Sequence, residues 1–95
     1  MFYAYVLRSL SADFYYKGHC KDLDDRLKQH NSGMTRSIRT YIPFEIIYFE
    51  EFESLEDAVK REKYFKSAVG RRFLKAKIGG SSSMPARPNL KLNFR

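Results

Sequence analysis

Two segments near the start of the chain carry the residue pattern of paired β-strands. Residues 2–7 and 14–18 are dominated by aromatic and aliphatic side chains, and a more polar stretch separates them, which predicts a β-hairpin. With a four-residue turn at 9–12, Tyr5 would lie directly opposite Tyr16. Because side chains alternate between the two faces of a strand, these two phenols would share one face of the hairpin.

A helix and a third strand are expected after the hairpin. Asp22 has the residue type of an N-cap, and Gly33 stands where a glycine commonly ends a helix. Residues 34–42 are polar and basic and are expected to form a loop, which Pro43 ends. The apolar run at 44–50 predicts a third strand that is more buried than the first two.

The second half of the chain is predicted to be mainly helical. Ser54 marks the start of a helix that should run to about Ala68, and Gly70 should break it before a short third helix at 71–78. Residues 79–95 begin with glycines and serines and then carry only basic charges, so a flexible tail is expected there. The order strand–strand–helix–strand–helix–helix predicts an α+β domain ahead of this tail.

The composition indicates one folded unit, residues 1–78, with a core of its own. Hydrophobic residues make up 43% of the chain and aromatic residues 16%, which excludes wholesale disorder. The single cysteine, Cys20, excludes an intramolecular disulfide and argues against a cysteine-based zinc site. No apolar run is long enough to span a bilayer, and the start does not resemble a signal peptide. A cytoplasmic protein without membrane contact is therefore expected.

The net charge of +7 is concentrated in the second half of the chain. Residues 1–59 contain 7 Lys or Arg against 10 Asp or Glu, whereas residues 60–95 contain 11 Lys or Arg against one acid. Such a basic half is typical of a chain that meets a polyanion, either nucleic acid or an anionic membrane surface. A solvated helix face followed by a basic tail is the structural alternative, and charge by itself does not choose between them.

One carboxylate falls where the second helix should be apolar. At 100° per residue the apolar stripe of this helix passes through position 62, which is a glutamate. The stripe consists of Leu55, Ala58, Val59, Phe65 and Val69. A partly buried carboxylate is costly without compensation. The compensation can be a salt bridge or a bound divalent cation, and taken alone the residue pattern favours the salt bridge.

The first helix has a similar anomaly. Leu23, Arg26, Leu27 and His30 share one face, so half of a short inward stripe is polar. Arg26 and His30 are one turn apart and can reach the same ligand group. The structural alternative is an arginine bonded to nearby carbonyl or carboxylate groups and a partly buried histidine at the helix end.

Taken together, these residues resemble the motif of the GIY-YIG nuclease family. That family is named for two tripeptides on a hairpin, which correspond here to residues 3–5 and residues 16–18. A helix with an arginine and a histidine follows in the family, as Arg26 and His30 do here, and a later helix carries a glutamate, as Glu62 does. The resemblance covers residues 2 to about 78 and is greatest to small standalone members.

Two departures from the family pattern lie in the tripeptides. Tyr3 and Ala4 replace the usual Gly and Ile, while the last residue of this tripeptide, Tyr5, is retained. Lys17 replaces an apolar residue in the second tripeptide, and we expect it on an exposed outer face of the hairpin.

The resemblance implies both a fold and a chemistry. The family's fold is a three-stranded antiparallel sheet flanked by helices, and its members are metal-dependent endonucleases. Carried over position by position, Glu62 would hold one Mg²⁺ or Mn²⁺ ion, and Tyr5 would be a general base whose pKa Arg26 or the metal lowers. His30 would receive the proton of Tyr5 or orient it. Arg26 would clamp the phosphate, and Tyr16 would bond the scissile phosphate or the attacking water. The implied products carry a 5′ phosphate and a 3′ hydroxyl.

The expected activity is hydrolysis of DNA, guided by DNA structure or by a weak sequence preference, in DNA repair or recombination. A second copy of the chain or a partner protein would supply further targeting. Flanking phosphates would be contacted by Arg36, Arg39, Lys66, Arg71 and Arg72. One alternative is a nucleic-acid-binding module that kept the fold without catalysis. A second alternative is an adaptor that applies its basic half to a membrane or a protein.

Overall fold

A computed structural model describes residues 1–78 of the chain. The sheet contains β1 (Phe2–Ser9), β2 (Tyr15–Cys20) and β3 (Phe44–Phe52), and the helices are α1 (Leu23–Asn31), α2 (Leu55–Lys66), α3 (Ala68–Lys77) and a 3₁₀ helix, η1 (Arg36–Tyr41). The three strands are antiparallel in the order β2-β1-β3. The predicted α+β class and order of elements are therefore confirmed, with η1 as an addition.

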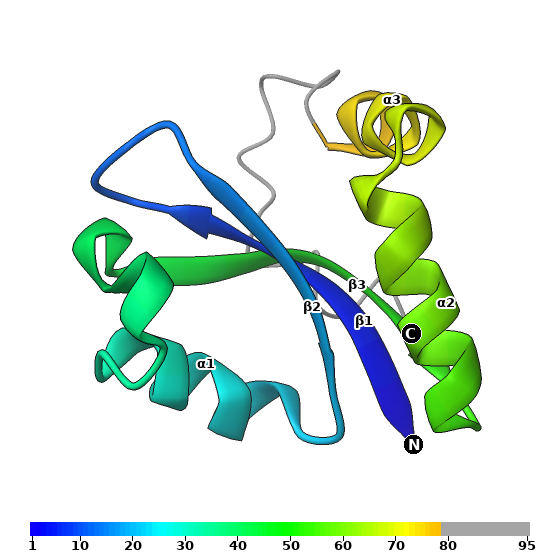
Figure 1. Cartoon of the computed structure of the whole chain (residues 1–95), viewed down its shortest axis with the longest axis horizontal. Coiled ribbons are helices and arrows are strands. Elements are labelled where there is room, and N and C mark those ends of the chain that lie inside the picture. The colour runs from blue at the N-terminus through cyan, green and yellow to red at the C-terminus, as the bar shows by residue number, and fades with distance from the viewer. Residues whose placement is uncertain (79–95) are drawn as a thin grey trace.

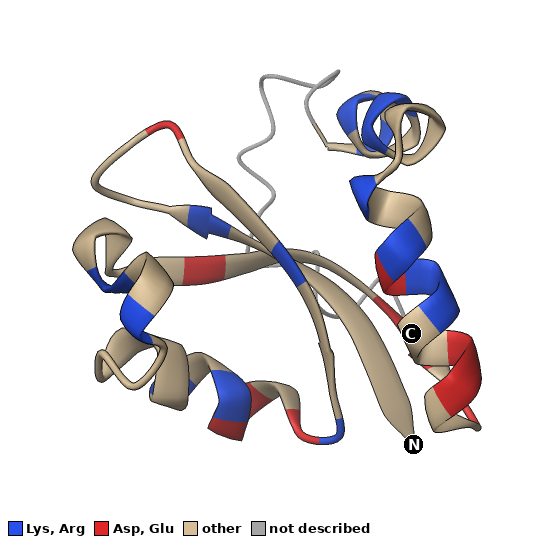
Figure 2. Ribbon diagram, in the orientation of Figure 1, with Lys and Arg blue, Asp and Glu red and all other residues tan. Residues whose placement is uncertain are grey.

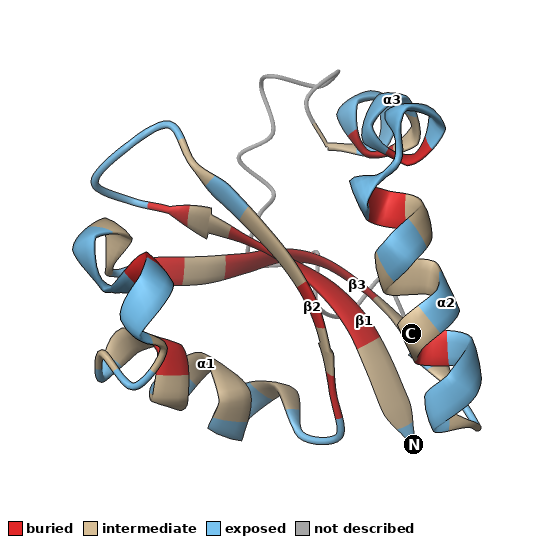
Figure 3. Cartoon of the chain, viewed as in Figure 1, coloured by how far each residue is buried: buried red, intermediate tan, exposed pale blue. Residues whose placement is uncertain are grey.

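The helices cover both faces of the sheet. Figure 1 shows α1 and η1 on one side and α2 with α3 on the other. The central strand β1 is buried on both faces, as the run of buried residues in Figure 3 shows. Tyr5 and Leu7 pack in the cluster on the α1 side, which includes Ile38 of η1. Ala4 and Val6 pack in the cluster on the side of α2 and α3. One strand thus connects two separate layers of core.

The predicted register of the hairpin is wrong by two residues. Tyr5 lies opposite Gly18, and Tyr16 lies opposite Leu7. The loop is longer than expected because the Ser9 hydroxyl accepts from the backbone N–H groups of residues 11 and 12, both at 3.0 Å, and bends the chain there. A slip of two residues leaves every side chain on its original face, so the two phenols still share one face, in a diagonal arrangement.

The first helix has the predicted ends. The Asp22 side chain accepts from the Asp25 backbone N–H at 2.9 Å, and Gly33 has a φ of 87°, the left-handed conformation that favours glycine. The following segment was expected to be a loop, but η1 forms within it. Its residue Ile38 is buried beneath α1 against the sheet. This tertiary contact explains why a helical turn forms in a segment whose sequence has no helical periodicity of apolar residues.

The break between α2 and α3 lies at Ser67 and not at Gly70. The Ser67 hydroxyl donates to the Tyr64 carbonyl at 2.6 Å and accepts from the Gly70 backbone N–H at 3.0 Å, so it ends one helix and starts the next. Gly70 lies inside α3, where an added Cβ would come within 1.7 Å of the Tyr64 carbonyl oxygen. Its role is to permit close packing. The bend also takes Val69 out of the predicted stripe, and it is 54% exposed.

Two further expectations concern the ends and the surroundings of the domain. No helix within residues 1–78 has the length and apolar character needed to cross a membrane. The predicted flexible tail, residues 79–95, lies outside the described residues.

Candidate active site

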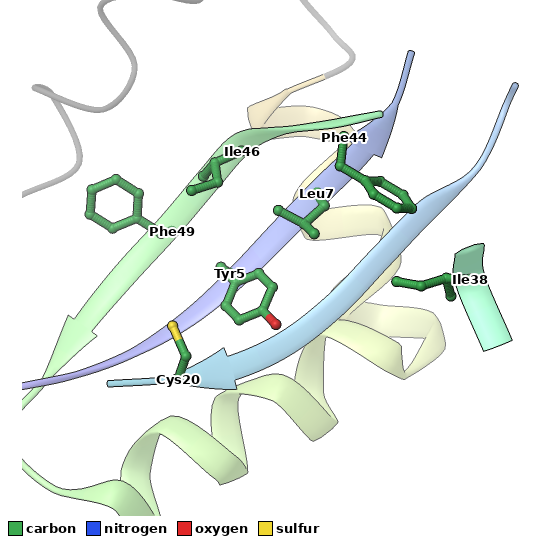
Figure 4. Packing of buried hydrophobic residues seen from close by; sticks show 7 residues of the cluster. All are labelled: Tyr5, Leu7, Cys20, Ile38, Phe44, Ile46 and Phe49. Atoms are coloured by element: carbon green, nitrogen blue, oxygen red, sulfur yellow. The ribbon is translucent and has the colours of Figure 1, made fainter. Parts of the chain in front are cut away.

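A buried tyrosine and a buried histidine meet beneath the edge of the sheet. Tyr5 projects from β1 and His30 from the last turn of α1, and each side chain is 2% exposed. The Tyr5 hydroxyl lies 3.0 Å from His30 Nε2. Gly18 leaves space for the phenol, because a Cβ there would be 2.6 Å from the hydroxyl oxygen. Figure 4 shows the hydroxyl directed toward β2. The glycine of the second tripeptide therefore has a steric role.

The histidine has a partner on each ring nitrogen. Thr35 Oγ1, just before η1, lies 2.8 Å from His30 Nδ1. When Nδ1 is protonated, it donates a hydrogen bond to Thr35 Oγ1. The unprotonated Nε2 then accepts a hydrogen bond from the Tyr5 hydroxyl. The sequence pattern did not single out Thr35, since a lone hydroxyl residue in a polar segment carries no signal of its own.

Burial keeps this pair neutral. Burial and then the neighbouring Tyr16 raise the pKa of Tyr5, and these effects outweigh the opposing influence of Arg26. Arg26 thus acts on the pKa of Tyr5 in the expected direction, but it does not bring that pKa below its ordinary value. Burial and then Arg26 lower the pKa of His30. At neutral pH the imidazole is thus an uncharged proton acceptor next to an uncharged phenol.

Tyr16 and Arg26 complete this side of the site. The Tyr16 ring meets the His30 ring edge-on, with centroids 5.0 Å apart, and its centroid lies 6.4 Å from that of Tyr5. Arg26 is half-buried on α1. Within residues 1–78 its guanidinium has no hydrogen bond or ion pair with another side chain. A guanidinium in this situation is suited to an incoming anion.

Glu62, on α2, is compensated by two basic neighbours. Its Oε1 lies 2.5 Å from Nδ1 of His19 on β2, and its Oε2 lies 2.6 Å from Nζ of Lys66 one turn along α2. Burial acts to raise the pKa of Glu62, but the hydrogen bonds from Lys66 and His19 outweigh it and hold the pKa below its usual range. The carboxylate is therefore ionised. The two partners of Glu62 in the structure are those of the salt-bridge alternative. The sequence pattern did not identify His19 as one of them.

The same carboxylate fits a divalent cation of the Mg²⁺ type. No group of three or more His, Cys, Asp or Glu side chains that could surround a metal ion occurs in the described part of the chain. Mg²⁺, however, commonly uses one or two carboxylates and completes its shell with waters and substrate phosphate oxygens. Glu62 is 16% exposed, and Lys66, at 55% exposed, lies where it could exchange with a cation. The donor set therefore suits a cation that binds together with a phosphate.

The edge strand β2 separates the two halves of the site. Tyr5 and His30 lie on its α1 side, and Glu62 lies on its α2 side against the neighbouring residue, His19. The two halves are close enough for the charge of Glu62 to add to the raised pKa of Tyr5. Because Gly18 has no side chain, the phenol hydroxyl of Tyr5 can approach the backbone of this strand. Of the five residues predicted for catalysis and metal binding, four therefore lie on the α1 side of β2, and Glu62 lies across this strand from them.

Three of the predicted phosphate-binding residues lie on the α2 and α3 side, where Figure 2 shows a concentration of basic residues. Lys66 bonds to Glu62, and the Arg71 guanidinium donates to the Lys66 carbonyl at 2.9 Å. Arg72 is exposed on α3. Lys17 was expected on an open face, but α2 and α3 cover that face and leave Lys17 half-buried, near Lys66 and Arg71.

The other two predicted residues lie across the sheet. Arg36 and Arg39 are exposed on η1. Arg39 donates through Nε to the Gly33 carbonyl at 3.2 Å, which holds the 3₁₀ helix against the end of α1. These two arginines are thus on the same side as His30 and are not part of the basic group near Glu62.

Comparisons with known proteins identify the family of the chain. A family model described as the GIY-YIG catalytic domain matches residues 1–75. A UPF0213 protein of Listeria monocytogenes serotype 4b is 38% identical over 63 residues, which are 65% of this chain and 70% of the relative. A UPF0213 protein of Clostridium perfringens is 36% identical over 67 residues, which are 70% and 71% of the two chains.

A solved structure extends the comparison to the fold. The solution NMR structure of a UPF0213 protein from Bacillus halodurans is 29% identical, has a TM-score of 0.52, and is matched over 100% of both chains. The family resemblance predicted from the tripeptides and the three polar helix residues is thereby confirmed. The chain belongs to the GIY-YIG family, a family of nucleases that act on nucleic acid and generally depend on a metal ion.

Proposed function

We propose that this protein is a metal-dependent endonuclease that hydrolyses phosphodiester bonds in DNA, guided by DNA structure or by a weak sequence preference. The observation that carries the proposal is the buried chain from Thr35 through His30 to Tyr5, next to the available guanidinium of Arg26 and across β2 from ionised Glu62. A purely structural site does not need a neutral acceptor, an anion clamp and an ionised carboxylate within one small region.

In this mechanism Tyr5 is the general base and His30 takes over its proton. The raised pKa of Tyr5 means that tyrosinate does not accumulate, so the phenol loses its proton to His30 Nε2 as it removes one from the attacking water. The lowered pKa of His30 keeps Nε2 available at neutral pH. Thr35 holds the ring in the required tautomer through Nδ1.

The remaining residues bind the phosphate and offset its charge. Arg26 would clamp the non-bridging oxygens, and Tyr16 would donate to the scissile phosphate or hold the water. Glu62 would hold one Mg²⁺ or Mn²⁺ ion, which when bound stabilises charge on the phosphate and the leaving 3′ oxygen. Lys66 would turn from Glu62 toward the phosphate. The products would carry a 5′ phosphate and a 3′ hydroxyl.

A second candidate function is a nucleic-acid-binding module that retains the fold without catalysis. The observation that favours it is that both oxygens of Glu62 already have basic partners, His19 and Lys66. In that case the carboxylate would serve stability alone, and its loss would lower the free energy of unfolding of a protein that does not cleave DNA.

A cleavage assay separates these two functions. Wild type, Glu62→Gln and the matched control Glu56→Gln, an exposed acid in the first turn of the same helix, are incubated with Mg²⁺ and branched, duplex and single-stranded DNA. We expect cleavage by wild type and the control and a loss of at least about 100-fold in Glu62→Gln, with unchanged circular dichroism and DNA binding. DNA binding without cleavage by any of the three proteins would favour the binding module.

A further inference from the structure

A cleft lies between the hairpin and α3, on the face opposite the Tyr5–His30 pair. Its volume is about 450 Å³, which falls within the range of about 300–1,000 Å³ typical of small-ligand sites. Val6, Leu74 and Ile78 give it an apolar surface. Tyr15 lines it as well, and that side chain is 44% exposed. The cleft thus combines an apolar wall with an aromatic ring that is open to solvent.

Basic side chains surround the same cleft. Lys17, Arg71 and Lys75 line it, and Asp13 is the one acid among the lining residues. Within residues 1–78 none of the three cations has a carboxylate partner within 4 Å. Burial lowers the pKa of Lys17, and the charges of Arg71 and Lys66 lower it further. Positive charges that crowd one another without an acid partner favour an anionic ligand.

The cleft is linked to Glu62 by contacts that pass through Lys66. Lys66 Nζ bonds to Glu62, and the carbonyl of the same lysine accepts from the guanidinium of Arg71, which lines the cleft. A DNA strand with its scissile phosphate near Glu62 would therefore have two basic residues beside it, Lys66 and Arg71, in the direction of the cleft.

We propose that this cleft binds an unpaired nucleotide of single-stranded DNA, with its base against the apolar wall and Tyr15 and its phosphates on the three cations. The inference rests on the proposed function and narrows its substrate to branched DNA with a single-stranded arm. A base inside a duplex is stacked on its neighbours, so only an unpaired base offers its face to a protein aromatic ring. Contacts to phosphate from the cations add affinity without reading sequence.

Binding without catalysis tests the cleft directly. Fluorescence anisotropy in EDTA compares a labelled single-stranded oligonucleotide with a duplex of the same sequence, using wild type, Tyr15→Ala and Tyr15→Phe. We expect Tyr15→Ala to weaken single-strand binding about tenfold, Tyr15→Phe to bind as wild type does, and duplex binding to change less than twofold. Equal loss on both DNAs, or no loss in Tyr15→Ala with its melting temperature unchanged, would overturn the proposal.

A charge comparison tests the basic half of the site. The double variant Arg71→Ala/Lys75→Ala is matched by Lys60→Ala/Lys63→Ala, which removes the same charge from exposed positions of α2 that do not line the cleft. The slope of log K against log salt for single-stranded DNA should fall by about 1.4 in the cleft variant and by less in the control. Equal slopes in the two variants would contradict a localised site.

Cleavage assays on a flapped DNA and on a fully duplex DNA distinguish failure of the cleft proposal from failure of the nuclease proposal. If wild type cleaves and Tyr15→Ala cleaves the flap as fast as wild type does, the cleft proposal fails while the nuclease stands. If wild type cleaves neither DNA, yet Tyr15→Ala loses single-strand binding, the nuclease fails while the cleft proposal stands.

Discussion

The two faces of the small sheet handle polar groups in opposite ways. On the α1 side, Tyr5 and His30 are almost fully buried, uncharged and satisfied by hydrogen bonds. On the α2 side, Glu62 is ionised, partly exposed and bonded to the basic side chains of His19 and Lys66. A buried neutral pair suits proton transfer, whereas a carboxylate at the edge of the solvent suits exchange between protein and substrate partners. In the proposed nuclease these are two parts of one reaction, divided by β2.

Removal of the buried imidazole should have the largest effect on stability. His30→Ala leaves the Tyr5 hydroxyl without its partner and creates a cavity beneath α1, so we expect a loss of about 3 kcal/mol in the free energy of unfolding. Urea denaturation followed by circular dichroism measures it. The matched variant is Glu62→Ala on the half-exposed side. If Glu62→Ala destabilised the protein more than His30→Ala did, the contrast between the faces would be wrong.

A smaller loss should follow from filling the space above the phenol. In Gly18→Ala the new methyl group would meet the Tyr5 hydroxyl oxygen at 2.6 Å, so the ring must move away from His30. We expect about 2 kcal/mol of destabilisation and a loss of cleavage. Double substitution with Tyr5→Phe, which removes the hydroxyl, should recover part of the stability. An unchanged melting temperature in Gly18→Ala would show that the close approach is not a constraint.

The neutral histidine should make stability depend on pH. The folded-state pKa of His30 is lowered, so the unfolded chain binds the proton more readily below its own pKa of about 6.5. Stability from this residue is therefore present above about pH 6.5 and is lost as the pH falls toward the lower folded-state pKa. Urea midpoints between pH 8 and pH 5 should decrease in wild type and decrease less in His30→Gln. Parallel curves for the two proteins would contradict a buried neutral imidazole.

The smallest effect is expected at the outer end of the chain of hydrogen bonds. Thr35→Val keeps the shape but removes the partner of His30 Nδ1, which should cost about 1 kcal/mol. Thr35→Ser, which retains the hydroxyl, should restore most of that stability and of the cleavage rate. Cleavage by Thr35→Val at the wild-type rate would remove the threonine from the mechanism.

The sequence predicts the local elements better than the contacts between them. Asp22 and Gly33 define α1 because capping and left-handed geometry depend on residue type alone. The hairpin register depends on how the Ser9 hydroxyl bends the turn, and this cannot be deduced by counting the residues between the strands. Gly70 had the residue type of a helix break, but the structure uses its missing side chain for close packing against Tyr64.

The same distinction applies to the candidate site. Glu62 and His30 could be found from the sequence because a polar residue interrupts an apolar helix face in each case. Their partners could not be found in that way. His19 and Thr35 lie in a strand and in an irregular segment, and only the packing of α2 and α1 on the sheet brings them into contact with these residues.

The most direct test of the proposed mechanism is the rate of Mg²⁺-dependent cleavage of branched DNA by Tyr5→Phe, measured beside wild type. This substitution removes only the hydroxyl that lies 3.0 Å from His30 Nε2. We predict a loss of at least about 100-fold in rate, with DNA binding retained and the folded circular dichroism spectrum unchanged. Cleavage by Tyr5→Phe at the wild-type rate would contradict proton transfer from Tyr5 to His30 as the basis of hydrolysis.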